Sequence, residues 1–229
     1  MRKIINYFTR GELILWGMSV LTVAVSFFAF SNDGYMTLFA SLIGVTAIIV
    51  NAKGNPAGQA MMIVFSIFYG IISFDCAYYG EMFTYLGMTA PMALMAFISW
   101  IKNLYGDSRE VKVNKIKRTE IIFMFILTAF VSMIFYFLLK YFHTANLIPS
   151  TFSVTTSFIA VYLTFRRSAY FSLAYASNDI ILIVLWTLAS LKNISYVSVL
   201  MCFVMFFVND IYGFISWRKM EKRQFSESI

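Results

Sequence analysis

The chain has 229 residues, of which 60% are hydrophobic and only 13% are charged. Soluble domains are roughly half apolar and a quarter charged, so this composition excludes an ordinary soluble domain and an intrinsically disordered chain. The formal net charge of +7 does not indicate nucleic-acid binding, because membrane proteins gather basic residues at one face of the bilayer. Cys76 and Cys202 lie far apart in apolar segments, so they indicate neither a disulfide framework nor a zinc site.

Eight apolar segments are long enough to cross a bilayer as helices, which takes about 20 residues. In chain order they cover residues 13–30, 36–52, 60–78, 81–101, 121–141, 147–165, 169–190 and 194–217. The first one follows several basic residues, as the core of a signal peptide does. It is too long for such a core and lacks a cleavage site of small residues, so we expect a retained helix.

The basic residues are distributed unequally between the two ends of these spans. If the eight segments alternate in direction, all of the 18 Lys and Arg residues except Lys140 and Lys192 fall on the same side. Loops rich in Lys and Arg stay in the cytoplasm. We therefore expect a multi-pass protein of the cell (inner) membrane with both termini in the cytoplasm.

A short motif recurs along the chain. The tetrapeptide Phe-Ile-Ser-Trp at 97–100 returns at 214–217, an offset of 117 residues, and each copy ends a span on the basic side. The same offset, with small shifts, aligns three consecutive spans with the last three. Four spans separate the equivalents, so both sets run in the same direction, as in small sugar facilitators. Trp100 and Trp217 themselves are predicted to be anchors in the interfacial aromatic belt.

These observations predict an all-α integral membrane protein of about eight transmembrane helices, with two parallel three-helix bundles joined by a linker helix. The expected parts are an N-terminal cytoplasmic segment with an extra helix (1–35), the first bundle (36–103), a basic cytoplasmic loop (104–119), the linker helix (120–145), the second bundle (146–218) and a cytoplasmic tail (219–229). Repeats of this kind place a substrate site between the bundles near the middle of the membrane.

Polar residues in the middle of a span are costly in lipid and therefore indicate a partner, a cavity or a function. Four of the six repeat spans carry their least lipid-like residues at one depth. These residues are Asn178 with Asp179, Asn209 with Asp210, Tyr69 and Pro91. Unrelated packing requirements would scatter in depth, which favours a shared site. The alternative is that Asn and Asp only join helices through hydrogen bonds worth roughly 0.6–2 kcal/mol each, and that Pro91 only kinks its helix.

Helical spacing predicts which side chains share this site. The expected substrate-binding residues are Asn178, Asn209, Asp179, Asp210, Tyr69, Tyr175, Tyr212 and Trp186. Aromatic rings stack on a flat ring system and amides bind its edges, while carboxylates suit a cationic ring or sugar hydroxyls. One member of each Asn-Asp pair is expected to point away from any single cavity. For Trp186 a place in the aromatic belt is an equal alternative.

Other polar residues receive more ordinary interpretations. Gln59 is expected to line an access path or to cap its helix, and Asp75 and Glu81 are interpreted as solvated acids at the outer mouth. The sequence has no Gly-rich phosphate loop, no metal-ligand cluster and no Ser-His-Asp set, because its single histidine, His143, lies in a predicted outer loop. No enzyme, cofactor or metal is therefore indicated.

The motifs resemble those of the PnuC-type vitamin transporters over about residues 36–218. The matching elements are Lys53-Gly54, Tyr79-Gly80-Glu81-Met82, Pro91, the 97–100 motif, Asn178-Asp179 with Trp186, and Asn209-Asp210-Ile211-Tyr212-Gly213. The resemblance implies a nicotinamide riboside carrier that works by facilitated diffusion and tends to form trimers. It also implies that a cytoplasmic kinase traps the substrate by phosphorylation.

One segment departs from the family pattern. Many nicotinamide riboside members have a Trp-rich, Asn-containing stretch where this chain has 169–175, without Trp or Asn. Tyr175 would then replace a stacking Trp, and Asn178 would supply the amide. Relatives that carry thiamine, riboflavin or deoxynucleosides leave those solutes as alternative substrates. Two other classes stay open, namely a scaffold that docks a partner on its basic loop and a proton-coupled exporter that uses Asp179 or Asp210.

Overall fold

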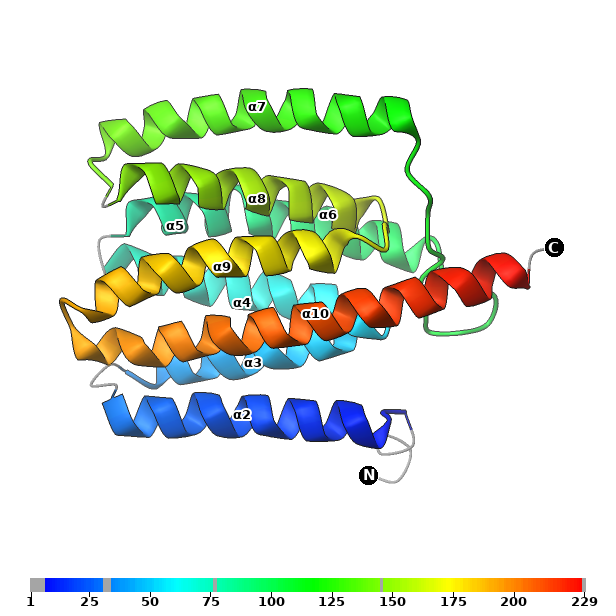
Figure 1. Ribbon diagram of the computed structural model, residues 1–229, viewed down its shortest axis with the longest axis horizontal. Helices are drawn as coiled ribbons and strands as arrows, with labels where there is room; N and C mark the ends of the chain where they lie inside the picture. The colour runs from blue at the N-terminus through cyan, green and yellow to red at the C-terminus, as the bar shows by residue number, and fades with distance from the viewer. Residues whose placement is uncertain (1–6, 31–33, 76–77, 145, 228–229) are drawn as a thin grey trace.

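The computed structural model describes residues 7–30, 34–75, 78–144 and 146–227, and Figure 1 shows these as a bundle of helices. In chain order the elements are α2 (Arg10–Phe30), α3 (Tyr35–Ala52), α4 (Ala57–Asp75), α5 (Tyr79–Thr84), the π-helical turn η1 (Tyr85–Thr89), α6 (Ala90–Ile101), α7 (Arg118–Tyr141), α8 (Leu147–Phe165), α9 (Phe171–Ser190), the 3-10 turn η2 (Ile194–Tyr196) and α10 (Val197–Ser226). Among the described residues, eight helical segments are long and apolar enough to cross a membrane, because α5, η1 and α6 form one span. The predicted number of spans is confirmed.

Six of the spans begin one to three residues away from the predicted position, and two spans also end elsewhere than predicted. The third span, α4, ends at Asp75 rather than 78, and Cys76 lies outside the described residues. The last helix, α10, continues past the predicted end at 217 to Ser226. Its extension is held by Gln224, whose side chain accepts a hydrogen bond from Val113 N (2.8 Å) and donates one to Val111 O (3.1 Å). The segment that contains Val111 and Val113 thus binds the extension and keeps this end of the helix ordered.

The span that contains Pro91 is not broken but locally widened. Proline has no N–H to donate and its ring clashes with the preceding turn. The π-helical turn η1 ends two residues before Pro91 and absorbs this conflict, so α5, η1 and α6 continue as one span. π-Helical turns are often found at functional sites.

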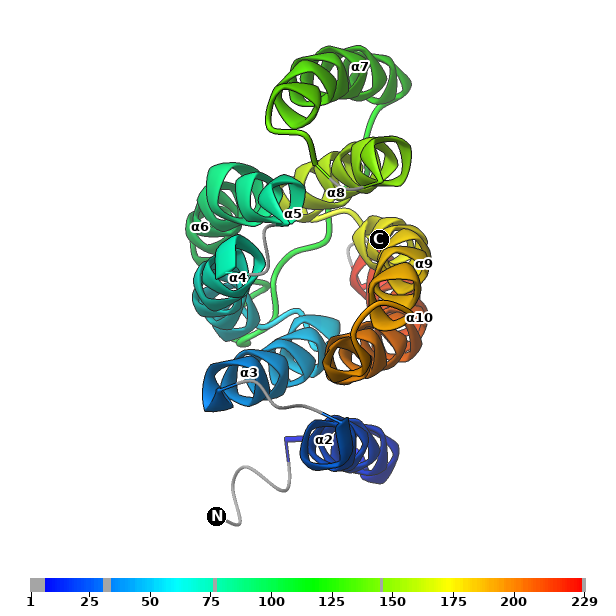
Figure 2. The same ribbon diagram turned by 90° about the vertical axis from the view of Figure 1, so that its left-hand side faces the viewer.

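The helices are arranged as a ring with two outer additions. Figure 2 shows α3, α4 and α6 on one side and α8, α9 and α10 on the other, with space between the ribbons. The ring closes through contacts of α3 with α10 and of α6 with α8. Outside the ring, α2 packs on α10 and α3, while α7 packs on α8. The ring therefore consists of two groups of three spans that meet at two seams.

The recurring tetrapeptide forms the contacts at both seams. At the first seam, Trp217 Nε1 donates to Asn51 O (2.8 Å) and Ser216 Oγ donates to Ala52 O (2.7 Å). This copy of the motif thus binds the last turn of α3, the first helix in the opposite group.

At the second seam, Trp100 Nε1 donates to Thr164 O (2.9 Å) and Ser99 Oγ donates to Phe165 O (3.1 Å). The accepting carbonyls differ by 113 positions between the seams, and so do the left-handed residues that follow them, Gly54 and Arg167. The two turns are therefore alike in their conformation as well as in their partners. We call these two sets of hydrogen bonds the Ser-Trp clasps.

The clasps correct the prediction for the two tryptophans. Trp100 and Trp217 are not anchors in an aromatic belt, because both are 0% exposed. Their rings lie 5.2 Å apart, and Phe171 packs against both. A belt position was predicted because each Trp ends its span beside a Lys, and a buried Trp at a helix end has the same sequence pattern.

We predict that Trp100→Phe and Trp217→Phe each destabilise the protein. Each change removes the indole donor from a buried carbonyl, which keeps only its hydrogen bond from Gly54 N (Asn51 O) or from Arg167 N (Thr164 O). The lost hydrogen bond costs about 0.5–1.5 kcal/mol, and the melting temperature in detergent should fall by a few degrees.

A matched control is Trp16→Phe, because Trp16 Nε1 donates to Thr46 Oγ1 at an exposed position. Equal decreases in melting temperature for all three variants would mean that the clasp hydrogen bonds do not stabilise the protein more than an exposed Trp hydrogen bond does.

Candidate functional site

An enclosed cavity lies between the two groups of helices. Its polar lining comes from Asn51, Gln59, Tyr85 and Thr89 on one side and from Ser157, Tyr175, Asn178, Asp179 and Asp210 on the other. Five apolar side chains complete it, namely Ile48, Met62, Phe65, Phe171 and Phe206. The open space is only about 30 Å³, enough for one or two waters. A larger solute can be held here only when the helices or aromatic rings move apart.

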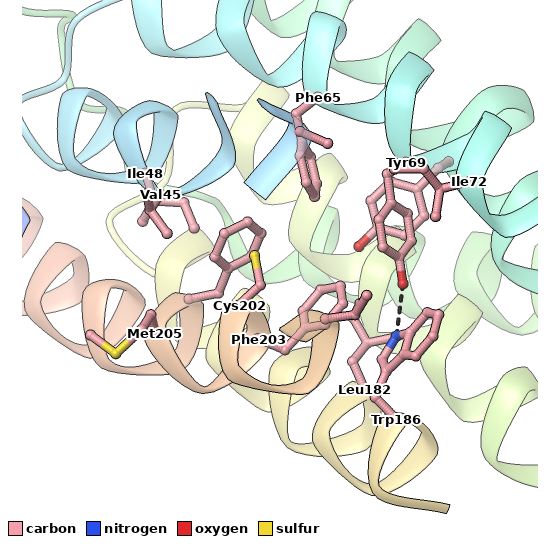
Figure 3. Close-up of a cluster of buried hydrophobic side chains, with 14 of the residues drawn as sticks. Val45, Ile48, Phe65, Tyr69, Ile72, Leu182, Trp186, Cys202, Phe203 and Met205 are labelled. Atoms are coloured by element: carbon pink, nitrogen blue, oxygen red, sulfur yellow. Dashed lines mark hydrogen bonds between the residues drawn. The ribbon is translucent and has the colours of Figure 1, made fainter. Parts of the chain in front are cut away.

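Aromatic side chains close the cavity at both ends. Towards the basic side the closure is Phe171 with the clasp residues Trp100 and Trp217. Towards the other side, Trp186 Nε1 donates to Tyr69 Oη (2.7 Å), a hydrogen bond that joins α9 to α4 across the two groups and is drawn in Figure 3. The cavity is thus sealed from both sides of the membrane.

The orientation of Asn178 is fixed by the neighbouring helix. Its Oδ1 accepts hydrogen bonds from Thr156 Oγ1 (2.9 Å) and Ser153 Oγ (3.3 Å), both on α8. With the oxygen occupied in this way, the amide NH₂ is the group left for the cavity. Asn178 therefore offers a hydrogen-bond donor pair to anything that enters.

Two amide side chains, those of Asn51 and Gln59, line the opposite side of the cavity. Gln59 Nε2 donates to Asn51 Oδ1 (2.9 Å), and both residues are buried. This bond leaves the Gln59 carbonyl oxygen as an acceptor and the Asn51 NH₂ as a donor. The interpretation of Gln59 as an access-path or capping residue gives way to a place in the cavity wall. The signal available in the sequence was its spacing of eight residues from Asn51 around the Lys53-Gly54 turn.

The cavity is acidic. Asp179 and Asp210 come from α9 and α10, both are buried, and their carboxyl groups interact directly. Asp179 Oδ2 has no hydrogen-bond partner among the described residues. Two adjacent carboxylates repel each other when both are ionised. A cationic group placed beside them would remove that repulsion.

A third acid lies behind Asn178. Glu81 is only 3% exposed, its Ser153 hydrogen-bond partner also contacts Asn178, and its Oε2 is unpartnered among the described residues. The prediction that Glu81 is a solvated loop acid was therefore wrong. It was placed at the very start of its span, but the helix begins at Tyr79 and its first turn packs against α8. For Asp75, whose side chain is outside the described set, that prediction stays untested.

The eight predicted site residues separate into three sets. Tyr175, Asn178, Asp179 and Asp210 line the cavity, whereas Tyr69 and Trp186 form its closure on the side away from the basic loops. Asn178 and Asp179 both face the same cavity, so the expectation that one of them must point away was wrong for this pair. For Asn209 and Asp210 it is confirmed.

Asn209 and Tyr212 face the N-terminal helix instead of the cavity. Asn209 Nδ2 donates to Ser19 Oγ (2.8 Å) and Tyr212 Oη donates to Glu12 Oε1 (2.8 Å), both acceptors being on α2. The structure thus does not place these two residues at the cavity, in contrast to the prediction. Successive helical residues differ by about 100° in direction, and the presence of α2 on that side could not be seen from the spacing.

Comparisons with known proteins agree with this architecture. The model of the nicotinamide mononucleotide transporter family matches residues 34–219. The nicotinamide riboside transporter PnuC of Neisseria mucosa is 24% identical over 227 residues, which is 97% of this chain and 86% of the relative. The crystal structure of the vitamin B3 transporter PnuC is similar with a TM-score of 0.82 at 23% identity, covering 95% of this chain and 94% of that chain.

We predict that Asn209→Ala loosens α2 without unfolding the ring. The change removes the donor to Ser19, which is 0% exposed, so amide hydrogen exchange should accelerate in the middle turns of α2. The neighbouring Ile211→Ala, on an exposed face of α10, serves as the control. Unchanged exchange in α2 after Asn209→Ala would contradict a joining role for this residue.

Proposed function

The chain belongs to the nicotinamide mononucleotide transporter family, and we propose that it imports nicotinamide riboside across the cell membrane. The observation that carries this proposal is the acidic, amide-lined cavity between the two groups of helices. Nicotinamide riboside is a pyridinium cation with a carboxamide and a ribose. Asp179 and Asp210 suit the cation, the Asn178 NH₂ suits the carboxamide oxygen, and the remaining hydroxyl and amide groups suit the ribose.

The cavity favours the riboside over the mononucleotide, although the family takes its name from the latter. None of the described residues that line the cavity is a Lys or Arg. A phosphate group would bring negative charge next to Asp179 and Asp210 with no cation to pair with it, and a buried unpaired charge is strongly unfavourable. The dephosphorylated cation meets no such penalty.

The same argument supports uptake by facilitated diffusion with trapping. A membrane potential that is negative inside favours entry of a monovalent cation by about 2.3 kcal/mol per 100 mV. Once a cytoplasmic kinase adds a phosphate, the product no longer suits the acidic cavity and cannot return. No energy-coupling domain is needed for this scheme, and the two groups of helices need only rock about the cavity.

The topology that we propose follows the sequence interpretation. The two groups of three spans act as parallel repeats in a three-plus-one-plus-three arrangement, with α7 as the linker and α2 as an addition. The matching partners of the two Ser-Trp clasps support this equivalence. Both termini are placed in the cytoplasm because of the charge asymmetry, and a trimer is proposed from the family resemblance alone.

Counterflow in proteoliposomes tests the function. Vesicles preloaded with nicotinamide riboside should take up labelled riboside in a saturable manner. Nicotinamide mononucleotide, thiamine, riboflavin, thymidine and deoxyadenosine should compete poorly. Strong competition by one of these solutes would reassign the substrate, and no exchange with folded protein would remove the transport proposal.

We predict that Asn178→Ala weakens riboside binding about tenfold, the value of one good hydrogen bond. Asn209→Ala should leave binding unchanged, because that side chain contacts α2. Binding to the purified variants by calorimetry distinguishes the two. Equal effects of both changes would contradict the assignment of Asn178 to the cavity.

We predict that Asp179→Asn reduces the preference for charged over uncharged ligand. A hydrogen bond or contact with a charged group is worth about 1.5–3 kcal/mol, so affinity for nicotinamide riboside should fall tenfold or more. Affinity for its uncharged 1,4-dihydro form should change little. If both forms lose affinity equally, the carboxylate acts through structure and not through charge.

A further inference from the structure

A second, larger hollow lies outside the ring, on the side of the basic loops. It is a groove of about 580 Å³, walled by α7, α8 and α9 and bounded by the segment 114–116 and by α10. Figure 2 shows why space is present here, since α7 stands beyond α8 at the edge of the molecule. Among the described elements, α7 makes its substantial helix contacts with α8 alone. The space between α7 and α9 is therefore not filled by contacts between these two helices.

The wall of the groove is apolar and lies at the depth of lipid chains. It includes Ile121 and Phe125 of α7, Ile159 and Leu163 of α8, and Leu173 of α9. These residues belong to the first or last eight residues of their helices, so the wall reaches about 10 Å inward from the helix ends. Phe125 is 55% exposed and Leu173 is 39% exposed, which leaves the groove open towards the surrounding bilayer.

The rim of the groove at the helix ends carries cationic groups. Arg218 lies over the Tyr170 ring at 5.1 Å and pairs with Glu221. The other acid nearby, Glu120, is already bound to Arg166. Lys115 makes no ion pair with any described residue and lies over the Phe225 ring at 3.8 Å. The rim therefore has a net positive charge that no acid of the described chain neutralises.

We propose that this groove is a specific binding site for one anionic phospholipid of the leaflet that faces the basic loops. An acyl chain lies against the apolar wall, and the headgroup phosphate lies at the rim beside Lys115 and Arg218. Basic pockets between transmembrane helices at the cytoplasmic interface are suited to acidic headgroups. The same lipid fills the angle between α7 and α9 and so stabilises the otherwise one-sided packing of α7.

Native mass spectrometry and thermal unfolding test this site. Delipidated protein in detergent is titrated with dioleoyl phosphatidylglycerol or dioleoyl phosphatidylcholine. We expect one tightly bound phosphatidylglycerol and a rise in melting temperature, with phosphatidylcholine binding at least fivefold more weakly. Glycerol phosphate, which has the charge without the chains, should not compete.

Two variants separate the headgroup from the chain. Lys115→Gln should lower the affinity for phosphatidylglycerol about fivefold, the value of one basic residue near an anionic surface. Ser177→Trp fills the groove from α9 and should abolish binding of both lipids. Ser177 is exposed and its hydroxyl binds only Leu173 O of its own helix, so the ring can be inserted without breaking a contact between helices.

Matched controls are Lys112→Gln on the same segment and Ile180→Trp on α9, since neither residue lines the groove. Both should bind lipid as the unchanged protein does. Equal binding of the two lipids, or unchanged binding in Lys115→Gln, would overturn the proposal. So would a cross-link that places a second copy of the chain in the groove of delipidated protein.

Discussion

The two Ser-Trp clasps are the constraint on which the rest of the structure depends. The last turns of helices α3 and α8 are buried, so their carbonyls need hydrogen-bond donors from the protein. The turns that follow these helices supply one donor each, from Gly54 N to Asn51 O and from Arg167 N to Thr164 O. Trp217 and Ser216 satisfy the carbonyls of α3, and the equivalent pair at 99–100 satisfies those of α8. Each group of helices thus completes the other. The seams at the basic face cannot open without breaking these four hydrogen bonds.

The cavity exists because the clasps and the Tyr69-Trp186 bond hold the two groups together at its two ends. Between these two ends lie buried polar atoms, which in most protein interiors would have hydrogen-bond partners. Asp179 Oδ2 and Glu81 Oε2 lack partners among the described residues, although unpaired polar groups are expensive at this depth. The carbonyl oxygen of Asn178, which accepts hydrogen bonds from Thr156 and Ser153, shows that the fold can pair polar atoms at this depth. Of these two oxygens, the one on Asp179 belongs to a residue that lines the cavity, so it is the one that a cation bound there can reach.

The features that could be predicted from the sequence are those that the bilayer constrains strongly, namely the length of each span and the depth of its polar residues. The bilayer fixes span length, so all eight spans were found, and the depth of Asn178 and Asp210 correctly indicated the cavity. Depth does not specify direction, and Asn209 and Tyr212 were assigned to the wrong side because their partners on α2 lie almost 200 positions away. Glu81 was missed because an acid at a helix start usually reaches water. In each case the deciding contact is with a residue remote in sequence.

The position of α2 makes the two seams unequal. Glu12 is buried and binds both Lys53, at the end of α3, and Tyr212 of α10, while Ser19 binds Asn209 of α10. This helix therefore bridges the seam between α3 and α10 from outside. Among the described elements, no helix bridges the seam between α6 and α8 in this way, because α7 packs on α8 and makes no comparable contact with α6. A movement that opens the α6–α8 seam must break its clasp and the hydrogen bond from Arg167 Nη1 to Ser99 Oγ (2.8 Å). Opening the other seam must break its clasp and the contacts that Glu12 makes with α3 and α10. The two seams are therefore supported from outside by different parts of the chain, the α3–α10 seam by the whole helix α2 and the α6–α8 seam by the Arg167 side chain of the turn that follows α8.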